Sequence, residues 1–279
     1  MLKKTKPKLK LNLIKSKKGR LLLASLFVFS VIAVLLLFLH SRILEITVYE
    51  FAHESVAAPF TIAFIADHHN TKYGAEQESL LTLIREGEPD LILLGGDIFC
   101  HVGNGEESWH LVHGLLQLDV PVIYVSGNHE MNRSDLYSIT QQLRRLGVIV
   151  PTDEAIVLDI RGNTVAVAGQ NIHRDGEVFN AVSDDALTIM LTHFPEIAKF
   201  YSDFDLIFAG HAHGGQVRVP LLFPNGLYAP GQGRFPEYTG GSYSLEGGCT
   251  LIVSRGLSVE RSAAFRLFNR PELVFVEAS

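Results

Sequence analysis

Several short apolar runs of this sequence end directly in Asp, Asn or His residues, and this pattern constrains the fold more than any other feature. Residues 91–94 form such a run, which leads through Gly95 and Gly96 to Asp97. A short apolar run that ends in a glycine turn is typical of a buried strand. Three further runs lead in the same way to Asp67 and His69, to Asn128 and His129, and to His211 and His213. Four strand ends could therefore bring oxygen and nitrogen ligands together.

The order of the predicted elements indicates an α/β fold. The first half of the chain predicts strands at 60–66, 91–94 and 122–125 and helices at 76–85, 106–116 and 135–146, the last capped by Ser134. Such alternation is typical of strands joined by helical crossovers. The second half has less helix, with strands predicted at 155–160, 164–168, 187–191, 206–209, 250–253 and 272–276. We therefore expect a second sheet packed on the first, with long loops in the glycine-rich segment 210–248.

The beginning of the chain has the pattern of a membrane anchor. Residues 1–20 carry eight lysines and one arginine but no acidic residue, and the nineteen residues 21–39 carry no charge. A helix of that length spans about 28 Å, enough to cross a bilayer. The apolar segment is longer than that of a cleaved signal peptide and no Ala-x-Ala pattern follows it, which favours an uncleaved anchor. The lysines place the N-terminus in the cytoplasm, which predicts a single-pass protein of the cytoplasmic membrane whose folded domain is extracytoplasmic.

The whole chain divides into four predicted segments. They are a basic cytoplasmic tail at 1–20, a transmembrane anchor at 21–39, a juxtamembrane connector at 40–58 with a strand near 43–49, and one folded domain at 59–279. Beyond the tail the chain has 15 basic and 30 acidic residues. Because an acidic body repels phosphates, we do not expect a nonspecific nucleic-acid binder.

Cys100 and Cys249 could form one disulfide but not a framework, and the oligomeric state cannot be derived from the sequence.

Each polar motif taken alone has an ordinary structural explanation. An Asp after two glycines often forms an Asx turn or a helix cap, and a single histidine such as His193 at the end of an apolar run is more often structural than a ligand. His211 and His213 are harder to explain in this way, because the glycines around them allow close backbone approach. The co-occurrence of the motifs at strand ends favours a metal site, and mixed carboxylate and imidazole ligands suit Mn, Zn or Fe. His68 would point away from His69 in an extended chain, so we expect it to support a ligand or face solvent.

Five motifs in this order resemble the signature of the calcineurin-like metallophosphoesterase superfamily. They are Asp67-x-His69, Gly96-Asp97, Gly127-Asn128-His129-Glu130, His193 and Gly210-His211-x-His213. More narrowly, residues 210–216, 253–257 and 270–273 are similar to the bacterial membrane-associated branch of that family. The resemblance implies a four-layer α-β-β-α sandwich with two metal ions at the strand ends.

The resemblance also implies a role for each residue of the motifs. One metal ion would be held by Asp67, His69 and His213, the other by Asn128, His193 and His211, with Asp97 as the bridge. Two such ions can lower the pKa of a shared water, and the resulting hydroxide would attack phosphorus without a serine or cysteine nucleophile. His129 would face the leaving group or the phosphoryl oxygens, and could protonate the leaving alkoxide.

The sequence departs from the family pattern three residues after Asp97. Many members of the superfamily have an acidic residue there that orients the catalytic histidine, whereas this chain has Cys100. A thiol cannot hold a histidinium as a carboxylate would. Either Glu130 takes over this support, or His129 is less basic.

These observations predict a phosphoesterase that acts on phosphodiester or pyrophosphate bonds of a phosphorylated small molecule or lipid. The arginines that phosphoprotein phosphatases of the superfamily carry near these motifs are absent, which argues against protein substrates. Arg218, Arg234 and Arg255 lie in predicted loops and would suit phosphate oxygens, although surface pairing explains them equally well. The alternatives are a phosphomonoesterase or nuclease of the same superfamily, or a scaffold that binds metal without catalysis. His173 matches no motif, and we assign it no role.

Overall fold

The computed structural model describes residues 16–151, 155–170, 185–259 and 266–279, so that His173 and most of the basic tail lie outside the described residues. The chain divides into two compact units, Met1–His40 and Ser41–Ser279. The first unit contains helix α1 (Lys17–His40). Its segment Lys17–Leu37 has a mean hydropathy of 2.6 and is long and apolar enough to cross a membrane, a property that signal sequences share.

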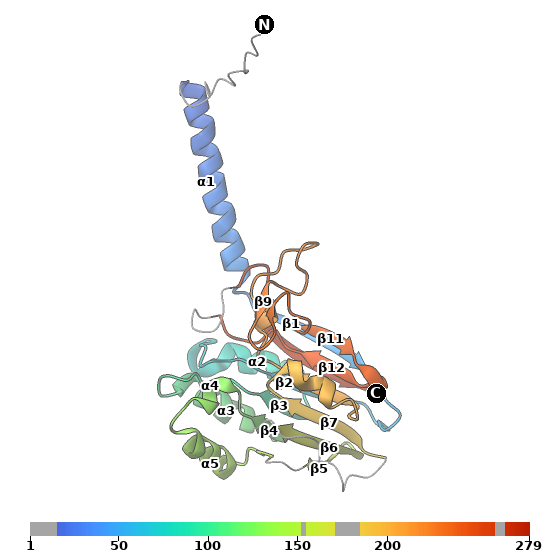
Figure 1. Ribbon diagram of the computed structural model, residues 1–279. Coiled ribbons are helices and arrows are strands. Elements are labelled where there is room, and N and C mark those ends of the chain that lie inside the picture. Colours follow the sequence, from blue (N-terminus) through green and yellow to red (C-terminus); the bar gives the residue numbers. More distant parts are fainter. Residues whose placement is uncertain (1–15, 152–154, 171–184, 260–265) are drawn as a thin grey trace. The chain divides into compact units, whose positions relative to one another are not determined.

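The second unit is built on two sheets (Figure 1). The first sheet has the order β1-β13-β2-β3-β4, with β1 at Glu45–Phe51, β13 at Glu272–Ala278, β2 at Phe60–Ile65, β3 at Leu91–Gly95 and β4 at Val122–Val125. Strands β2, β3 and β4 are parallel, whereas β13 is antiparallel to β2. The carboxyl ends of β2, β3 and β4 therefore meet at one edge, which is where the sequence predicts the ligands.

The second sheet is also mainly parallel. Its order is β11-β12-β8-β7-β6-β5, with β11 at Gly241–Ser244, β12 at Thr250–Val253, β8 at Leu206–Ala209, β7 at Leu187–Thr192, β6 at Asn163–Gln170 and β5 at Ala155–Ile160. The four central strands are parallel, and the edge strands β5 and β11 are antiparallel to their neighbours.

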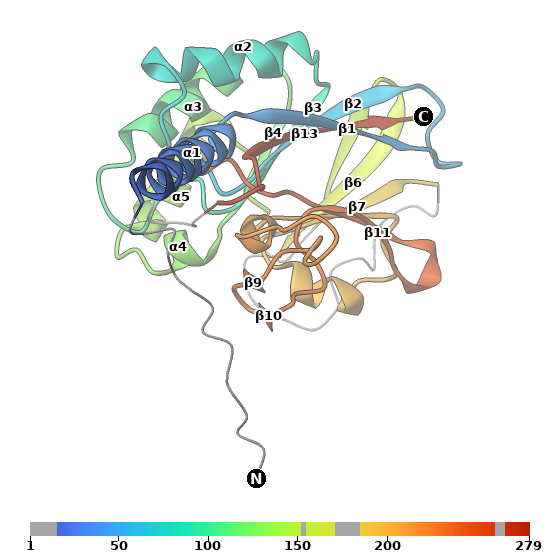
Figure 2. The ribbon, with the colours of Figure 1, turned by 90° about the horizontal axis from the view of Figure 1, so that it is seen from above.

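One apolar core lies between the two sheets, and two further cores cover their outer faces. Side chains from both sheets form the inner core, where the ring centroids of Phe64 and Phe208 are 5.0 Å apart. The outer face of the first sheet packs against α2 (Glu78–Glu86), α3 (Glu106–Leu116) and α5 (Leu136–Leu146). Against the outer face of the second sheet pack η2 (Pro195–Phe200) and the loops that carry β9 (Tyr228–Ala229) and β10 (Gly233–Arg234) (Figure 2). This arrangement confirms the predicted α/β fold.

Strands β2 and β3 show why the sequence pattern was informative. Every residue of β3 is buried, because helices cover one face of the sheet and the second sheet covers the other. A strand buried on both faces is apolar along its whole length rather than alternating. The short elements η1 (Ala75–Gln77), α4 (Asn128–Met131), η3 (His213–Gly215) and η4 (Glu246–Gly248) complete the described structure.

Several details of the structure were not predicted from the sequence. Strand β11 was not predicted, since Gly-Ser-Tyr-Ser has little apolar character. Helix α5 has Asp135 rather than Ser134 at its N-cap position. The strand expected near 43–49 is β1, and it pairs with β13, so that most of segment 40–58 belongs to the folded unit.

Cys100 and Cys249 are both buried and free, so they form no disulfide.

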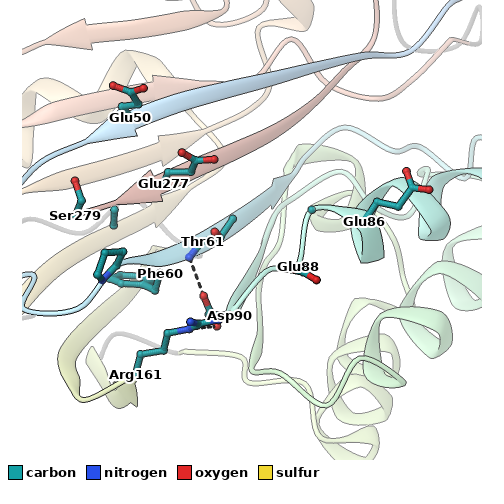
Figure 3. Close-up of a pocket in the computed structure, with 12 residues that line it drawn as sticks. Glu50, Phe60, Thr61, Glu86, Glu88, Asp90, Arg161, Glu277 and Ser279 are labelled. Atoms are coloured by element: carbon teal, nitrogen blue, oxygen red, sulfur yellow. Dashed lines mark hydrogen bonds and ion pairs between the residues drawn. The ribbon is translucent and has the colours of Figure 1, made fainter.

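A cavity of about 490 Å³ lies at the amino ends of β2 and β3, opposite the predicted ligands (Figure 3). Its charged lining side chains are Glu50, Glu86, Glu88, Asp90, Glu277 and Arg161. Asp90 accepts a hydrogen bond from the backbone N–H of Thr61 at 2.9 Å and pairs with Arg161 at 2.7 Å. These contacts hold the turn before β3 against β2 and the β5–β6 turn.

Candidate metal centre

The seven predicted ligands follow the carboxyl ends of five parallel strands. Asp67 follows β2, Asp97 follows β3, and Asn128 is the first residue of α4, after β4. The histidines follow β2, β7 and β8 of the two sheets. Six of these side chains form two groups in which the ligand atoms lie within 4.8 Å of one another: a first triad of Asp67, His69 and His213, and a second triad of Asp97, His193 and His211. The structure therefore brings together ligands that are up to 146 residues apart in the sequence.

The backbone around these ligands is strained. Asp97 and His213 have positive φ angles of 52° and 46°, which residues with a side chain rarely adopt and which cost about 1–3 kcal/mol each. Two glycines are required by close contacts. A Cβ atom at Gly96 would lie 2.8 Å from Nδ1 of His193, and one at Gly127 would lie 2.2 Å from Oδ1 of Asp97. Strain of this kind is typical of functional sites.

Asp97, a member of the second triad, also lies close to the first triad. Its Oδ1 accepts a hydrogen bond from the backbone N–H of His129 at 2.7 Å. Its Oδ2 lies 3.5 Å from Nε2 of His69, in the first triad, and 3.3 Å from Nε2 of His193, in the second. Ligands bound about 2.0–2.2 Å from one metal ion are separated by about 3.0–3.5 Å. Asp97 Oδ2 thus has the position of an oxygen that two neighbouring ions could share.

The first triad contains buried nitrogen atoms that no protein group satisfies. Nε2 of His69 lies 3.8 Å from Oδ1 of Asp67, and Nε2 of His213 lies 3.5 Å from the same oxygen. Among the described residues, neither ring nitrogen of His69 nor Nδ1 of His213 has a hydrogen-bond partner. An unpaired buried polar atom costs about 1–3 kcal/mol. The carboxylate and imidazole atoms of this triad lie close together but do not form hydrogen bonds with one another. This arrangement is suited to binding a metal ion.

The second triad is oriented by the backbone. Nδ1 of His193 lies 2.8 Å from the carbonyl oxygen of Gly95. Because a carbonyl can only accept, Nδ1 carries a proton, and Nε2 is directed at Oδ1 of Asn128, 3.2 Å away, and at Oδ2 of Asp97, 3.3 Å away. A histidine whose second nitrogen donates to a carbonyl is the usual arrangement of a metal ligand. The ring of His211 lies beside it, with centroids 4.9 Å apart.

The charges of the metal-free centre balance one another. Burial acts to lower the pKa of His69 and His193, but the aspartates beside them outweigh burial and raise these pKa values to about 10 and about 9. Burial lowers the pKa of His211 to about 4 and that of His213 to about 3. Burial acts to raise the pKa of the two aspartates, but the adjacent imidazoles hold both below the usual range. Two carboxylates therefore face two imidazolium groups, whose protons metal ions would displace.

His129 lies at the side of this centre and is partly buried. Its ring centroid is 4.3 Å from that of His69. Its Nδ1 lies 3.0 Å from Nδ1 of His101 and 3.8 Å from Sγ of Cys100. Burial, followed by the positive charges of neighbouring histidines, lowers the pKa of His129. Of the two alternatives for the missing acidic residue, the less basic His129 is the one that this geometry favours.

Glu130 supports the loop of Asp97 instead of the ring of His129. Its Oε2 accepts hydrogen bonds from the backbone N–H groups of Asp97 and Gly127 at 2.8 and 2.9 Å, and its Oε1 accepts one from Phe99 at 2.8 Å. Within the described ranges no hydrogen bond joins it to the His129 side chain. Burial and the nearby Asp97 charge raise the pKa of Glu130 to about 7. The sequence left open whether Glu130 supports His129; in the structure it binds backbone N–H groups around Asp97.

The three predicted substrate-binding arginines lie in different surroundings. Arg255 pairs with Glu272 at 2.8 Å and Glu45 at 3.0 Å, and so joins β13 to β1. Arg218 donates to oxygen atoms of a neighbouring loop. Arg234 is exposed in β10. In the described part of the chain, no hydrogen bond or ion pair joins these arginines to the predicted ligands, and structural pairing explains Arg255 directly.

Several residues around the ligands were missed because no motif marks them. Arg266 is 6 % exposed and donates to the carbonyl oxygen of Gly256, whose loop packs against Asp67. Asn269 donates to the carbonyl oxygen of His213 at 2.7 Å. His68 is fully buried, so it does not face solvent, and it lies 3.4 Å from both a glutamine and a serine side chain.

Comparison with known proteins identifies the family. A family model described as calcineurin-like phosphoesterase matches residues 60–215, more than half of the chain. The chain is 28% identical over 230 residues to the phosphodiesterase YaeI of Escherichia coli (strain K12), an alignment that covers 79% of this chain and 83% of that protein. It is 28% identical over 227 residues to the protein YpbG of Bacillus subtilis (strain 168), covering 77% and 79%. The crystal structure of TT1561 of Thermus thermophilus aligns with a TM-score of 0.46 at 12% identity, over 71% of this chain and 90% of that one. The chain belongs to the calcineurin-like phosphoesterase family and is a metal-dependent hydrolase of phosphoric esters.

Proposed function

We propose that the protein is a membrane-anchored phosphodiesterase or pyrophosphatase whose seven predicted ligands hold two metal ions, of Mn, Zn or Fe. The observation that carries this proposal is the position of Asp97 Oδ2 between His69 and His193, which belong to different triads. One buried carboxylate oxygen that faces two separate ligand groups suits two adjacent ions better than one.

The residues of the site would have different roles in the proposed reaction. Two bound metal ions would polarise the phosphoryl oxygens and lower the pKa of water near neutral pH. Asp67 and Asp97 are at most 1 % exposed and supply the negative charge that keeps cations in place. The Gly95 carbonyl fixes the ring of His193 so that Nε2 is directed at the centre, where a metal ion would displace its proton. The lowered pKa of His129 makes its protonated form a stronger acid, which favours protonation of the leaving alkoxide.

The proposed substrate class and the proposed membrane location are supported by different observations. A relative named as a phosphodiesterase supports diester hydrolysis, and the surroundings of Asp97 and Asn128 lack the arginines that protein phosphatases carry. The apolar segment Lys17–Leu37 and the lysines before it support an anchor with a cytoplasmic N-terminus, and substrates of the envelope, such as phosphorylated lipids. A C-terminal reporter that is active only in the cytoplasm would contradict this topology.

The test is hydrolysis of a bis-aryl phosphodiester by the full chain in detergent. We expect turnover that requires added Mn²⁺, is lost in Asp97→Asn and is kept in Asp90→Asn, the matched change at the opposite end of β3. Aryl monophosphate and single-stranded DNA, run in parallel, would reveal a monoesterase or a nuclease. A chain that binds two metal ions but turns over none of these substrates would be a scaffold, and the proposal would then be wrong.

A further inference from the structure

Three side chains with metal-binding atoms lie together just outside the two triads. They are Cys100, His101 and His129, and none of them is among the seven predicted ligands. Sγ of Cys100 lies 3.7 Å from Nδ1 of His101 and 3.8 Å from Nδ1 of His129, and the two Nδ1 atoms are 3.0 Å apart. All three atoms therefore lie within 3.8 Å of one another.

These separations are within about 0.3 Å of those expected for ligands on a single zinc ion. Bond lengths of about 2.3 Å to sulfur and about 2.0 Å to nitrogen place the ligand atoms of a tetrahedral site about 3.3–3.6 Å apart. We propose that Cys100 Sγ, His101 Nδ1 and His129 Nδ1 form a third metal site, which takes a thiophilic divalent cation such as Zn²⁺. The proposal does not depend on the reaction that the two-metal centre catalyses.

The backbone around the three ligands is held in place from two sides. Arg133 donates hydrogen bonds to the carbonyl oxygens of Cys100 and Gly103, and Asp135 fixes its guanidinium group at 2.7 and 2.8 Å. On the inner side Glu130 binds the backbone N–H of Phe99. The loop that carries Cys100 and His101 is thereby tied to the helix that carries His129. The ligand positions are set by these contacts rather than by a free loop.

The accessibility of the cluster suits an ion that enters from solvent. Cys100 is 6 % exposed, His129 is partly buried and His101 is exposed, so the thiol lies at the inner end of the cluster and His101 at its outer end. The two Nδ1 atoms are too close for both to carry a proton. An ion would take the place of the shared proton and release the thiol proton. It would leave the remaining proton of His129 on Nε2 and so hold this ring in one tautomer.

Cobalt tests the proposal, because a thiolate bound to Co²⁺ gives a charge-transfer absorption band in the near ultraviolet. The seven predicted ligands include no cysteine, so the band shows that a cysteine binds the cobalt ion, and the number of ions per chain separates a third site from the two-metal centre. We would saturate the full-length chain with Mn²⁺ and then titrate it with Co²⁺. The expected result is the band together with one further ion per chain, in the wild type and in the matched control Cys249→Ser. Cys100→Ser should abolish the band, and His101→Gln should weaken Co²⁺ binding at least about 10-fold.

Two results would overturn the third site. The first is a wild-type chain that binds cobalt without the band. The second is a band that His101→Gln leaves unchanged while only two ions are bound per chain, because Cys100 would then bind an ion of the first triad beside His69. Neither result depends on turnover, so an inactive enzyme would not obscure either one.

Discussion

The two ends of strands β2 and β3 use charge in opposite ways. At the carboxyl ends, Asp67 and Asp97 are buried on strained backbone, and ring nitrogens beside them have no hydrogen-bond partner among the described residues. At the amino ends, the acidic lining of the 490 Å³ cavity is more open, and Asp90 is paired with Arg161 and Thr61. The same two strands thus end in a cluster of carboxylates and imidazoles that suits cations and begin beside Asp90, whose charge is paired. Strain at one end and pairing at the other indicate that function is located at the first and stability at the second.

The largest expected effect is the loss of activity in Asp97→Asn. The amide keeps an acceptor for the backbone N–H of His129 but loses the charge that faces both triads. We expect kcat for a phosphodiester to fall by at least about 1,000-fold, equivalent to about 4 kcal/mol. Steady-state kinetics together with metal content would measure this. Retention of a tenth of the wild-type kcat would show that Asp97 is not a bridge.

Glu130→Ala should give the next largest effect, this time on stability. The substitution leaves three buried backbone N–H groups without their acceptor, each at a cost of about 1 kcal/mol or more. We expect the free energy of unfolding in urea to fall by about 3 kcal/mol, with weaker metal binding because the Asp97 loop is no longer held. Glu130→Gln is the control, since its oxygen can still accept from Asp97 and Gly127. If alanine and glutamine destabilise equally, the backbone hydrogen bonds are not the cause.

At the carboxyl ends of β2 and β3, the sequence predicts the ligands better than the residues that support them. The seven predicted ligands could be named because their motifs follow apolar runs and resemble those of a known family, and strands buried on both faces are the easiest to recognise. The supports of those ligands could not be named in the same way. Glu130 reaches back to residues 97 and 99, and Asn269 binds the carbonyl of His213, 56 residues earlier. Such contacts depend on tertiary packing, which also decided that Arg255 pairs with Glu272.

Metal uptake at the carboxyl ends should depend on pH. In the metal-free centre, the pKa values of His69 and His193 are raised to about 10 and about 9, so both rings are protonated at pH 7 and must lose a proton to become ligands. Metal affinity should therefore rise with pH and level off above about pH 9–10. Calorimetry in buffers of different ionisation enthalpy at pH 7 should show about two protons released per chain. Affinity that is constant between pH 6 and 8 would contradict the imidazolium pair.

The smallest expected effect lies at the amino ends, in Arg161→Ala. The Arg161 side chain is 59% exposed, and its 2.7 Å pair with Asp90 is an ordinary surface ion pair. Such pairs contribute about 0–1 kcal/mol, so the free energy of unfolding should fall by no more than about 1 kcal/mol. Asp90→Ala should cost more, because it also removes the acceptor of the Thr61 N–H. A double-mutant cycle measured by urea unfolding would separate these two contributions. Both variants should keep wild-type kcat, since they lie at the opposite ends of β2 and β3 from the ligands. A large loss of kcat in Arg161→Ala would mean that the two ends are coupled, and the division between function and stability would fail.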